Sequence, residues 1–225
     1  MRIPKSATRP DAVLLDLDGT LADTAPDLAN ALNNTLINFG KEKLPFETIR
    51  PHVSHGAKAL IKLGFDIDEQ DQDYTVKRQY LLDDYFDNIA EHTSLFAGMD
   101  SVLETLELQD TPWGIVTNKP AYLTEPLISA LELDTRAACV VSGDTTPYSK
   151  PHPAPLLHAC QHINVNASQC IYIGDAQRDI EAGRKAGMKT LAASFGYINK
   201  NDNIKLWGAD GIIDHPSEII DWIRQ

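Results

Sequence analysis

The sequence has few cysteines and no long apolar run. The three cysteines, Cys139, Cys160 and Cys170, are odd in number and widely spaced, which argues against a disulfide framework and against a zinc cluster. We expect buried free thiols in a reducing compartment. No segment is apolar for long enough to cross a bilayer, and residues 1–10 are polar rather than leader-like. These absences predict a soluble, cytoplasmic protein.

Basic residues are also in short supply. There are 20 Lys and Arg against 32 Asp and Glu, which gives a net charge of −12. Such a surface repels nucleic acid and anionic membranes, so we expect neither as a partner. A small anionic substrate would need a local cationic site. The chain of 225 residues is 43% hydrophobic, which allows one or two domains with a sizeable core, as a monomer or a homodimer.

Short apolar runs alternate with helical patterns along most of the chain. This alternation predicts an α/β fold, a Rossmann-like parallel sheet flanked by helices. Between residues 25 and 91 the pattern changes, because apolar side chains recur there at helical spacing and no strand is indicated. We therefore predict a core of residues 1–24 and 92–225 with an inserted helical cap of residues 25–91. The runs that predict strands are 12–17, 113–118, 139–142, 170–174, 190–193 and 211–213.

Two acids stand at the end of the first predicted strand. Asp16 and Asp18 are two residues apart, so they leave an extended strand on the same side. Gly19 then allows a sharp turn and a close approach of the backbone to a ligand. Two neighbouring carboxylates repel each other and need a metal, a proton or a cation between them. The alternative is an Asp-Gly turn with solvated acids.

Three further polar clusters follow later strands. Thr117 and Asn118 offer a hydroxyl and an amide, which can donate to phosphate oxygens or cap a helix. Lys150 lies in a proline-rich turn and is either a fixed point charge for phosphate or a surface lysine. Asp175 and Asp179 are one helical turn apart and can bind a hard cation or favour the start of a helix.

The four clusters together indicate a function more strongly than any one of them does. Carboxyl ends of parallel strands share one edge of a sheet, so all four clusters are predicted to meet there. The set contains a nucleophile, acids for a divalent ion and fixed donors, which is what phosphoryl transfer requires. His52 and His55 in the cap are candidates to touch a substrate. His158 and His162 are four residues apart but have no third ligand nearby, so we expect a solvated helix face.

At these residues the sequence resembles the haloacid dehalogenase superfamily of aspartate-nucleophile hydrolases. The DxDGT segment at 16–20, Thr117, Lys150 and the GDxxxD segment at 174–179 occur in the family's order, and the resemblance extends over essentially the whole chain. It implies a phosphatase that works through an aspartyl-phosphate. Residues 25–91 then correspond to the family's cap.

The resemblance also implies roles for individual residues. Asp16 is expected to be the nucleophile and Asp18 the general acid and base. For this role Asp18 must hold a proton near neutral pH, and we expect neighbouring carboxylates to raise its pKa while the metal opposes that rise. Mg²⁺ is expected on Asp16, the backbone carbonyl of Asp18, and Asp175, with Gly19 and Asp179 in support. The expected phosphate-binding residues are Thr117, Asn118 and Lys150.

Within the superfamily two substrate groups stay open. The DGTLADTAPD, TNKP and SKPHP segments resemble phosphoglycolate phosphatases. Segment 50–54 and the tail from 196 to 216 resemble N-acetylmuramic acid 6-phosphate phosphatases. Both readings imply a small phosphorylated metabolite as the partner.

Other classes fit the residues less well. A halide leaves without a proton, so a dehalogenase has no need of Asp18. A phosphomutase needs the same acid and base and is the nearer rival. A phosphoacceptor signalling domain is about half this length and has no helical insert. A catalytically inactive scaffold would have no use for the complete set of acids and lysine.

Overall fold

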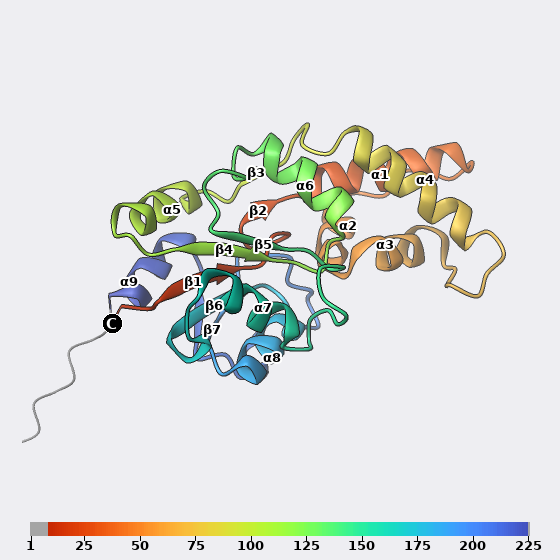
Figure 1. The fold of residues 1–225 in the computed structure, drawn as a ribbon. Coiled ribbons are helices and arrows are strands. Elements are labelled where there is room, and N and C mark those ends of the chain that lie inside the picture. The colour runs from red at the N-terminus through yellow and green to blue at the C-terminus, as the bar shows by residue number, and fades with distance from the viewer. Residues whose placement is uncertain (1–8, 225) are drawn as a thin grey trace, which may run out of the picture.

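A six-stranded parallel sheet forms the centre of the molecule (Figure 1). The computed structural model describes residues 9–224. The strand order is β5-β4-β1-β6-β7-β8, and every predicted strand is confirmed. Three predicted runs end early, because the chain leaves the sheet at Asp16, Thr117 and Ser142. The strands are β1 (Ala12–Leu15), β4 (Trp113–Val116), β5 (Cys139–Val141), β6 (Cys170–Gly174), β7 (Lys189–Ala193) and β8 (Gly211–Ile213).

Helices cover both faces of the sheet (Figure 1). Alternate side chains of a strand point to opposite faces, so Val13 and Leu15 join one hydrophobic cluster and Ala12 and Leu14 join another. The first cluster includes side chains of α5 (Met99–Leu108), α6 (Ala121–Ala130) and α9 (Ile219–Ile223). The second includes side chains of α7 (Ala154–Ile163) and α8 (Gln177–Ala186). The buried strands are thus apolar on both sides, which gives the continuous runs seen in the sequence.

The segment between β2 and β3 is helical, as predicted. Figure 1 shows its helices grouped at one end of the sheet. Leu28, Leu32 and Leu36, four residues apart, are buried in a hydrophobic cluster formed mainly by this segment. Its helices are α1 (Ala25–Asn38), α2 (Phe46–Ile49), the 3₁₀ helix η1 (Arg50–His55), α3 (Gly56–Phe65) and α4 (Tyr74–Asp87). The division into core and cap domains stays a prediction, and residues 1–8 and 225 of that core lie outside the described residues.

The helical segment is joined to the sheet by two short strands. β2 (Ala22–Asp23) and β3 (Ser94–Leu95) pair in antiparallel fashion, and each is too short to be recognised in the sequence. Asp27 adds a further link, because its carboxylate accepts hydrogen bonds from the backbone N–H of His92 and from the N–H and hydroxyl of Thr93. The two connections are therefore bound to each other.

The remaining elements are short. The 3₁₀ helices η2 (Ala167–Gln169), η3 (Ile204–Leu206) and η4 (Pro216–Glu218) connect strands and helices near the carboxyl end. All three cysteines are free and buried, as predicted. Among residues 9–224, no helix has the length and apolar character that a bilayer crossing requires.

Candidate active site

Three neighbouring strands bring the predicted residues to one edge of the sheet. β1 lies between β4 and β6, all three run in the same direction, and each is followed by a polar residue of the predicted site. Asp16, Thr117 and Asp175 are those residues, and each is at most 3% exposed. The structure therefore brings together the clusters that are scattered along the sequence.

Lys150 occupies the centre of this group. Its ammonium Nζ is fully buried, donates to Asp16 Oδ1 over 2.7 Å, and lies 2.7 Å from Asp179 Oδ1. It also donates to the Val116 carbonyl at 2.9 Å and to the Tyr172 hydroxyl at 2.8 Å. A buried charge needs paired charges and satisfied hydrogen bonds, and Lys150 has both. Its position over Asp16 is consequently fixed from several sides.

Three buried acids form a cluster beside this lysine. Carboxylate oxygens of Asp16, Asp175 and Asp179 all lie within 4.8 Å of one another. Burial raises the pKa of Asp16 to about 6, although the charge of Lys150 opposes this. Burial, together with the charges of Asp16 and Asp179, raises the pKa of Asp175 to about 7. The cluster has the oxygen ligands that a hard divalent cation prefers.

Asp175 has one satisfied oxygen and one free oxygen. Its Oδ2 accepts from the Ser54 hydroxyl at 2.8 Å and from the Tyr197 N–H at 2.8 Å. Its Oδ1 is buried and has no hydrogen-bond partner among residues 9–224. Gly19, with φ of 86°, passes so close that a Cβ there would collide with this carboxylate. An unpartnered buried oxygen next to two further acids fits a bound cation.

Asp18 lies in a different environment. Its Oδ1 accepts from the Thr24 hydroxyl at 2.6 Å and from Lys119 Nζ at 2.7 Å. Burial raises the pKa of Asp18, but the charge and hydrogen bond of Lys119 outweigh it, so the pKa lies below its ordinary value. The expectation that neighbouring carboxylates raise the pKa of Asp18 is therefore wrong for this arrangement, because its closest charged neighbour is a cation.

Thr117 and Asn118 differ in what their side chains contact. The amide of Asn118 donates to the Lys150 carbonyl and accepts from the Lys150 N–H, both over 2.9 Å. This reciprocal pair fixes the loop that carries Lys150. The hydroxyl oxygen of Thr117 accepts from the Lys119 N–H at 3.1 Å, which leaves its own O–H as a donor. Of the two, Thr117 is the better placed to donate to a phosphate oxygen.

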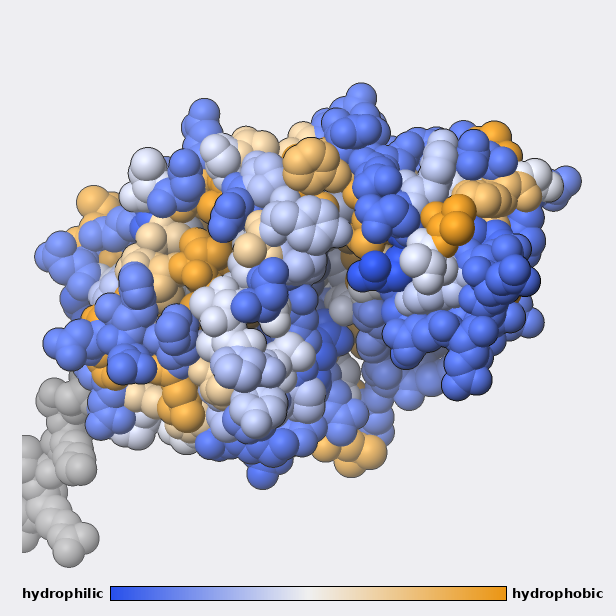
Figure 2. All heavy atoms as spheres, turned by 45° about the vertical axis from the view of Figure 1, so that its right-hand side comes forward, coloured by the Kyte–Doolittle hydropathy of each residue, from blue (hydrophilic) through white to orange (hydrophobic). Residues whose placement is uncertain are grey.

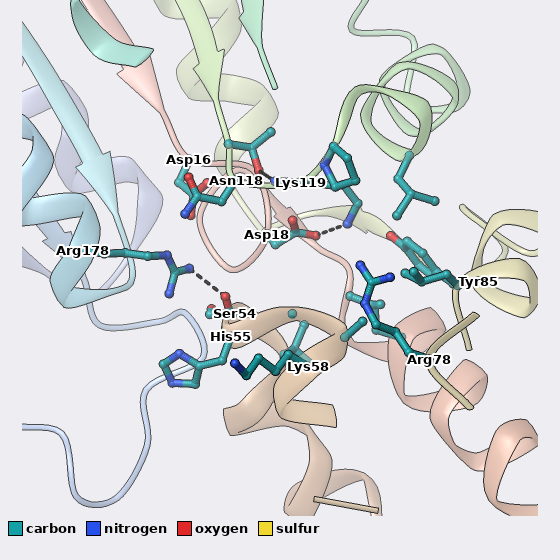
Figure 3. Close-up of a pocket in the computed structure, with 18 of the residues that line it drawn as sticks. Asp16, Asp18, Ser54, His55, Lys58, Arg78, Tyr85, Asn118, Lys119 and Arg178 are labelled. Atoms are coloured by element: carbon teal, nitrogen blue, oxygen red, sulfur yellow. Dashed lines mark hydrogen bonds and ion pairs between the residues drawn. The ribbon is translucent and has the colours of Figure 1, made fainter. Parts of the chain in front are cut away.

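The site opens into a cavity of about 430 Å³ between the sheet and the helical segment. Figure 2 shows the surface hollowed between these two parts, with many hydrophilic side chains around the hollow. Figure 3 shows side chains from both parts pointing into it. His55 is among the lining residues, whereas His52 is not. The polar side chains that line it include Asp16, Asp18, Ser54, His55, Lys58, Arg78, Tyr85, Asn118, Lys119 and Arg178.

Several residues of the site were not assigned from the sequence. Lys119 and Arg178 stand inside the quoted motifs, but nothing in the sequence shows that Lys119 pairs with Asp18. Arg178 donates to the Ser54 carbonyl at 2.7 Å, which links α8 to the helical segment. Tyr172 lies within the predicted strand 170–174, and nothing in the sequence indicates that its hydroxyl contacts Lys150. Only the fold reveals these contacts, because their partners are far apart in the chain.

Comparison with known proteins agrees with this geometry. The profile of the haloacid dehalogenase-like hydrolases matches residues 13–193. An N-acetylmuramic acid 6-phosphate phosphatase of Pseudomonas putida is 39% identical over 208 residues, which cover 92% of this chain and 93% of that protein. A phosphoglycolate phosphatase of Xanthomonas campestris pv. campestris is 39% identical over 211 residues, covering 93% and 95%.

A solved structure has the same architecture. The crystal structure of a predicted phosphoglycolate phosphatase from Haemophilus somnus superimposes with a TM-score of 0.85 at 26% identity, over 96% of this chain and 99% of that one. The sheet order, the acids at the strand ends and the matching profile lead to the same assignment. This chain belongs to the haloacid dehalogenase-like hydrolase family.

Proposed function

We propose that this protein is a magnesium-dependent phosphatase of the phosphoglycolate phosphatase type, which hydrolyses a small phosphate monoester. The observation that carries the proposal is the contact between Asp16 and Lys150. A buried carboxylate faces a cavity while a buried ammonium 2.7 Å away offsets its charge. A carboxylate can then approach a phosphate dianion that it would otherwise repel.

Asp16 attacks phosphorus and forms an aspartyl-phosphate, which water later hydrolyses. Lys150 and Thr117 hold the phosphate oxygens, while Asn118 keeps the Lys150 loop in place. Mg²⁺ would be held by Asp16, Asp175 and the Asp18 carbonyl, and when bound it neutralises negative charge on the transferring group. Asp179 supports Lys150 through their 2.7 Å contact.

Asp18 handles the proton in both halves of the reaction. The leaving alkoxide must gain a proton, and the attacking water must lose one. Lys119 lowers the pKa of Asp18 in the free protein. A substrate anion that attracts Lys119 would weaken this pair, so substrate binding itself would raise the pKa of Asp18 and favour its acid form.

The helical segment of residues 25–91 serves as a cap over the core of residues 1–24 and 92–225. Ser54, His55 and Arg78 come from this segment and line the cavity opposite Asp16. Such a cap would exclude water and select the ester that reaches the nucleophile. The proposed setting is the cytoplasm, with a small phosphorylated metabolite as partner and the protein acting as a monomer or homodimer.

The size of the cavity favours a second candidate substrate, N-acetylmuramic acid 6-phosphate. A two-carbon ester such as 2-phosphoglycolate would fill only part of about 430 Å³, whereas a substituted sugar phosphate would fill much more. Phosphatases of Pseudomonas putida and Pseudomonas aeruginosa that are 39% and 40% identical to this chain carry that name. The ratio of kcat/KM for the two esters decides between them.

Turnover of p-nitrophenyl phosphate with Mg²⁺ tests the chemistry. We expect Asp16→Asn to lower kcat by at least about 10³-fold, because the nucleophile is lost. Asp18→Asn should lower it by about 10²- to 10⁴-fold, because the water that hydrolyses the aspartyl-phosphate loses its general base. Asp87→Asn, an exposed acid at the end of α4, is the matched control and should keep full activity. Wild-type turnover in folded Asp16→Asn protein would refute the assignment. With a sugar phosphate as substrate, isomerised product without free phosphate would indicate a mutase.

A further inference from the structure

One face of α4 lines the cavity. Tyr74, Arg78, Leu82 and Tyr85 all border it, and their spacing of four, four and three residues places them on the same side of the helix. Three of these side chains, Tyr74, Arg78 and Tyr85, carry hydrogen-bond donors that suit an anion. The helix therefore presents a second polar group of donors in the cavity, separate from the phosphate-binding residues at the strand ends.

Arg78 is an exposed residue, and its guanidinium has no partner within the described part of the chain. Among residues 9–224 it makes no hydrogen bond and has no acid within 4.0 Å. Figure 3 shows it pointing into the cavity, toward Tyr85. The other cations that line the cavity are each engaged by an acid or a carbonyl, namely Lys58, Lys119 and Arg178. Arg78 is thus the cation left available for a ligand within the described residues.

Tyr85 provides an independent sign of a ligand. Its side chain is 1% exposed, and its buried hydroxyl has no hydrogen-bond acceptor among the described residues, because its polar neighbour is the ammonium of Lys119, which can only donate. Buried hydroxyls are normally satisfied, so an unpartnered one that borders a cavity indicates a missing acceptor. Burial raises the pKa of Tyr85 to about 12, so the hydroxyl keeps its proton and remains a donor at neutral pH.

On the basis of the proposed function, we propose that Arg78 and Tyr85 bind a carboxylate of the substrate, so that the preferred substrates are phosphate monoesters that also carry a carboxylate. The planar guanidinium fork matches the two oxygens of a carboxylate, and the Tyr85 hydroxyl adds a third donor. A neutral sugar hydroxyl would engage only one donor of the guanidinium fork and would gain no charge pairing. A second phosphate would call for a further free cation, and the other lining cations are engaged.

Two substrate pairs that differ in the carboxylate test this inference. The first pair is N-acetylmuramic acid 6-phosphate and N-acetylglucosamine 6-phosphate, and the second is 2-phosphoglycolate and ethyl phosphate. In at least one pair we expect Arg78→Ala to lower kcat/KM about 10- to 100-fold for the carboxylate ester and less than about 3-fold for its partner. Arg78→Lys should recover part of the loss, and Tyr85→Phe should lose less than Arg78→Ala.

Lys62→Ala is the matched control, because Lys62 is an exposed cation of the helical segment that does not line the cavity. It removes the same charge and should leave all four kcat/KM values unchanged. An equal loss for both members of each pair would overturn the inference. Turnover of p-nitrophenyl phosphate by the wild-type protein separates the two levels: its absence refutes the proposed phosphatase, whereas its presence leaves the carboxylate inference to be judged by the pairs.

Discussion

At the scale of single residues, the site holds more negative charge than one lysine can offset. Lys150 contacts both Asp16 and Asp179, while Asp175 keeps a buried oxygen without a partner. Burial, together with the negative charge of the neighbouring acids, raises the pKa of Asp16 to about 6 and that of Asp175 to about 7. Because their pKa values are raised, Asp16 and Asp175 are partly protonated near neutral pH. A divalent cation that binds their carboxylates would displace these protons.

This gives a pH-dependent prediction for metal-free protein. The folded pKa values exceed the value of 3.8 for an unperturbed aspartate, so the folded state binds more protons than the unfolded state between about pH 4 and pH 7. The free energy of unfolding should therefore fall as pH rises through that window. Added Mg²⁺ at about 100 times its Kd should raise Tm by about 5–10 °C at pH 8 and by less at pH 5.

Asp175→Asn is the informative variant in this thermal-melt experiment. The neutral amide avoids the unfavourable free energy of burying a charged carboxylate. The metal-free variant should therefore melt at or above the wild-type temperature at pH 8. It should also lose most of the Mg²⁺ shift, because a ligand oxygen with charge is gone. An undiminished Mg²⁺ shift in Asp175→Asn would place the cation elsewhere.

At the scale of elements, the sequence was sufficient to predict the strands of the parallel sheet and the residues that follow them. Asp16, Thr117 and Asp175 could be predicted to meet because parallel strands that bury both faces have a plain apolar signature, and their carboxyl ends share an edge. The contacts of Ser54 and Lys119 could not be predicted in this way. They depend on how the helical segment and the β4–α6 loop fold back over the carboxyl edge of the sheet. A local hydrophobic pattern in the sequence does not predict such a tertiary arrangement.

The pairing of β2 with β3 could not be predicted from the sequence either, because each strand has only two residues. Asp27 accepts from the N–H of His92 and from the N–H and hydroxyl of Thr93, all in the second connection. In Asp27→Asn an NH₂ group replaces one of the two carboxylate oxygens, so a donor would face the N–H and O–H donors of His92 and Thr93. We expect the free energy of unfolding in urea to fall by about 2–3 kcal/mol. The exposed Asp87→Asn should change it by less than about 0.5 kcal/mol, and an equal effect of the two variants would contradict the role of Asp27.

At the scale of the whole molecule, the helical segment is closed onto the sheet through η1. Arg50 donates to the carbonyls of Gly196 and Phe195, at 2.9 and 3.2 Å, and its guanidinium lies 4.9 Å from the centre of the Tyr197 ring. Tyr197 in turn supplies the N–H that holds Asp175. The contact that joins η1 to the segment after β7 therefore includes the residue whose N–H orients a proposed metal ligand.

Arg50→Ala should open this arrangement. Loss of charge-assisted hydrogen bonds worth about 1.5–3 kcal/mol would shift the balance toward an open cap, so kcat/KM should fall about tenfold or more and hydrogen exchange at residues 50–56 should accelerate. Lys43→Ala, a change at an exposed cation of the same segment, should alter neither quantity. Because a displaced Arg50 also frees Tyr197, the Mg²⁺-dependent gain in Tm should shrink in Arg50→Ala. If exchange accelerates while the Mg²⁺ gain stays intact, the contact of Arg50 and the metal site are independent, and the bonds of the Tyr197 hydroxyl to Asp23 and Ala25 hold this residue without Arg50.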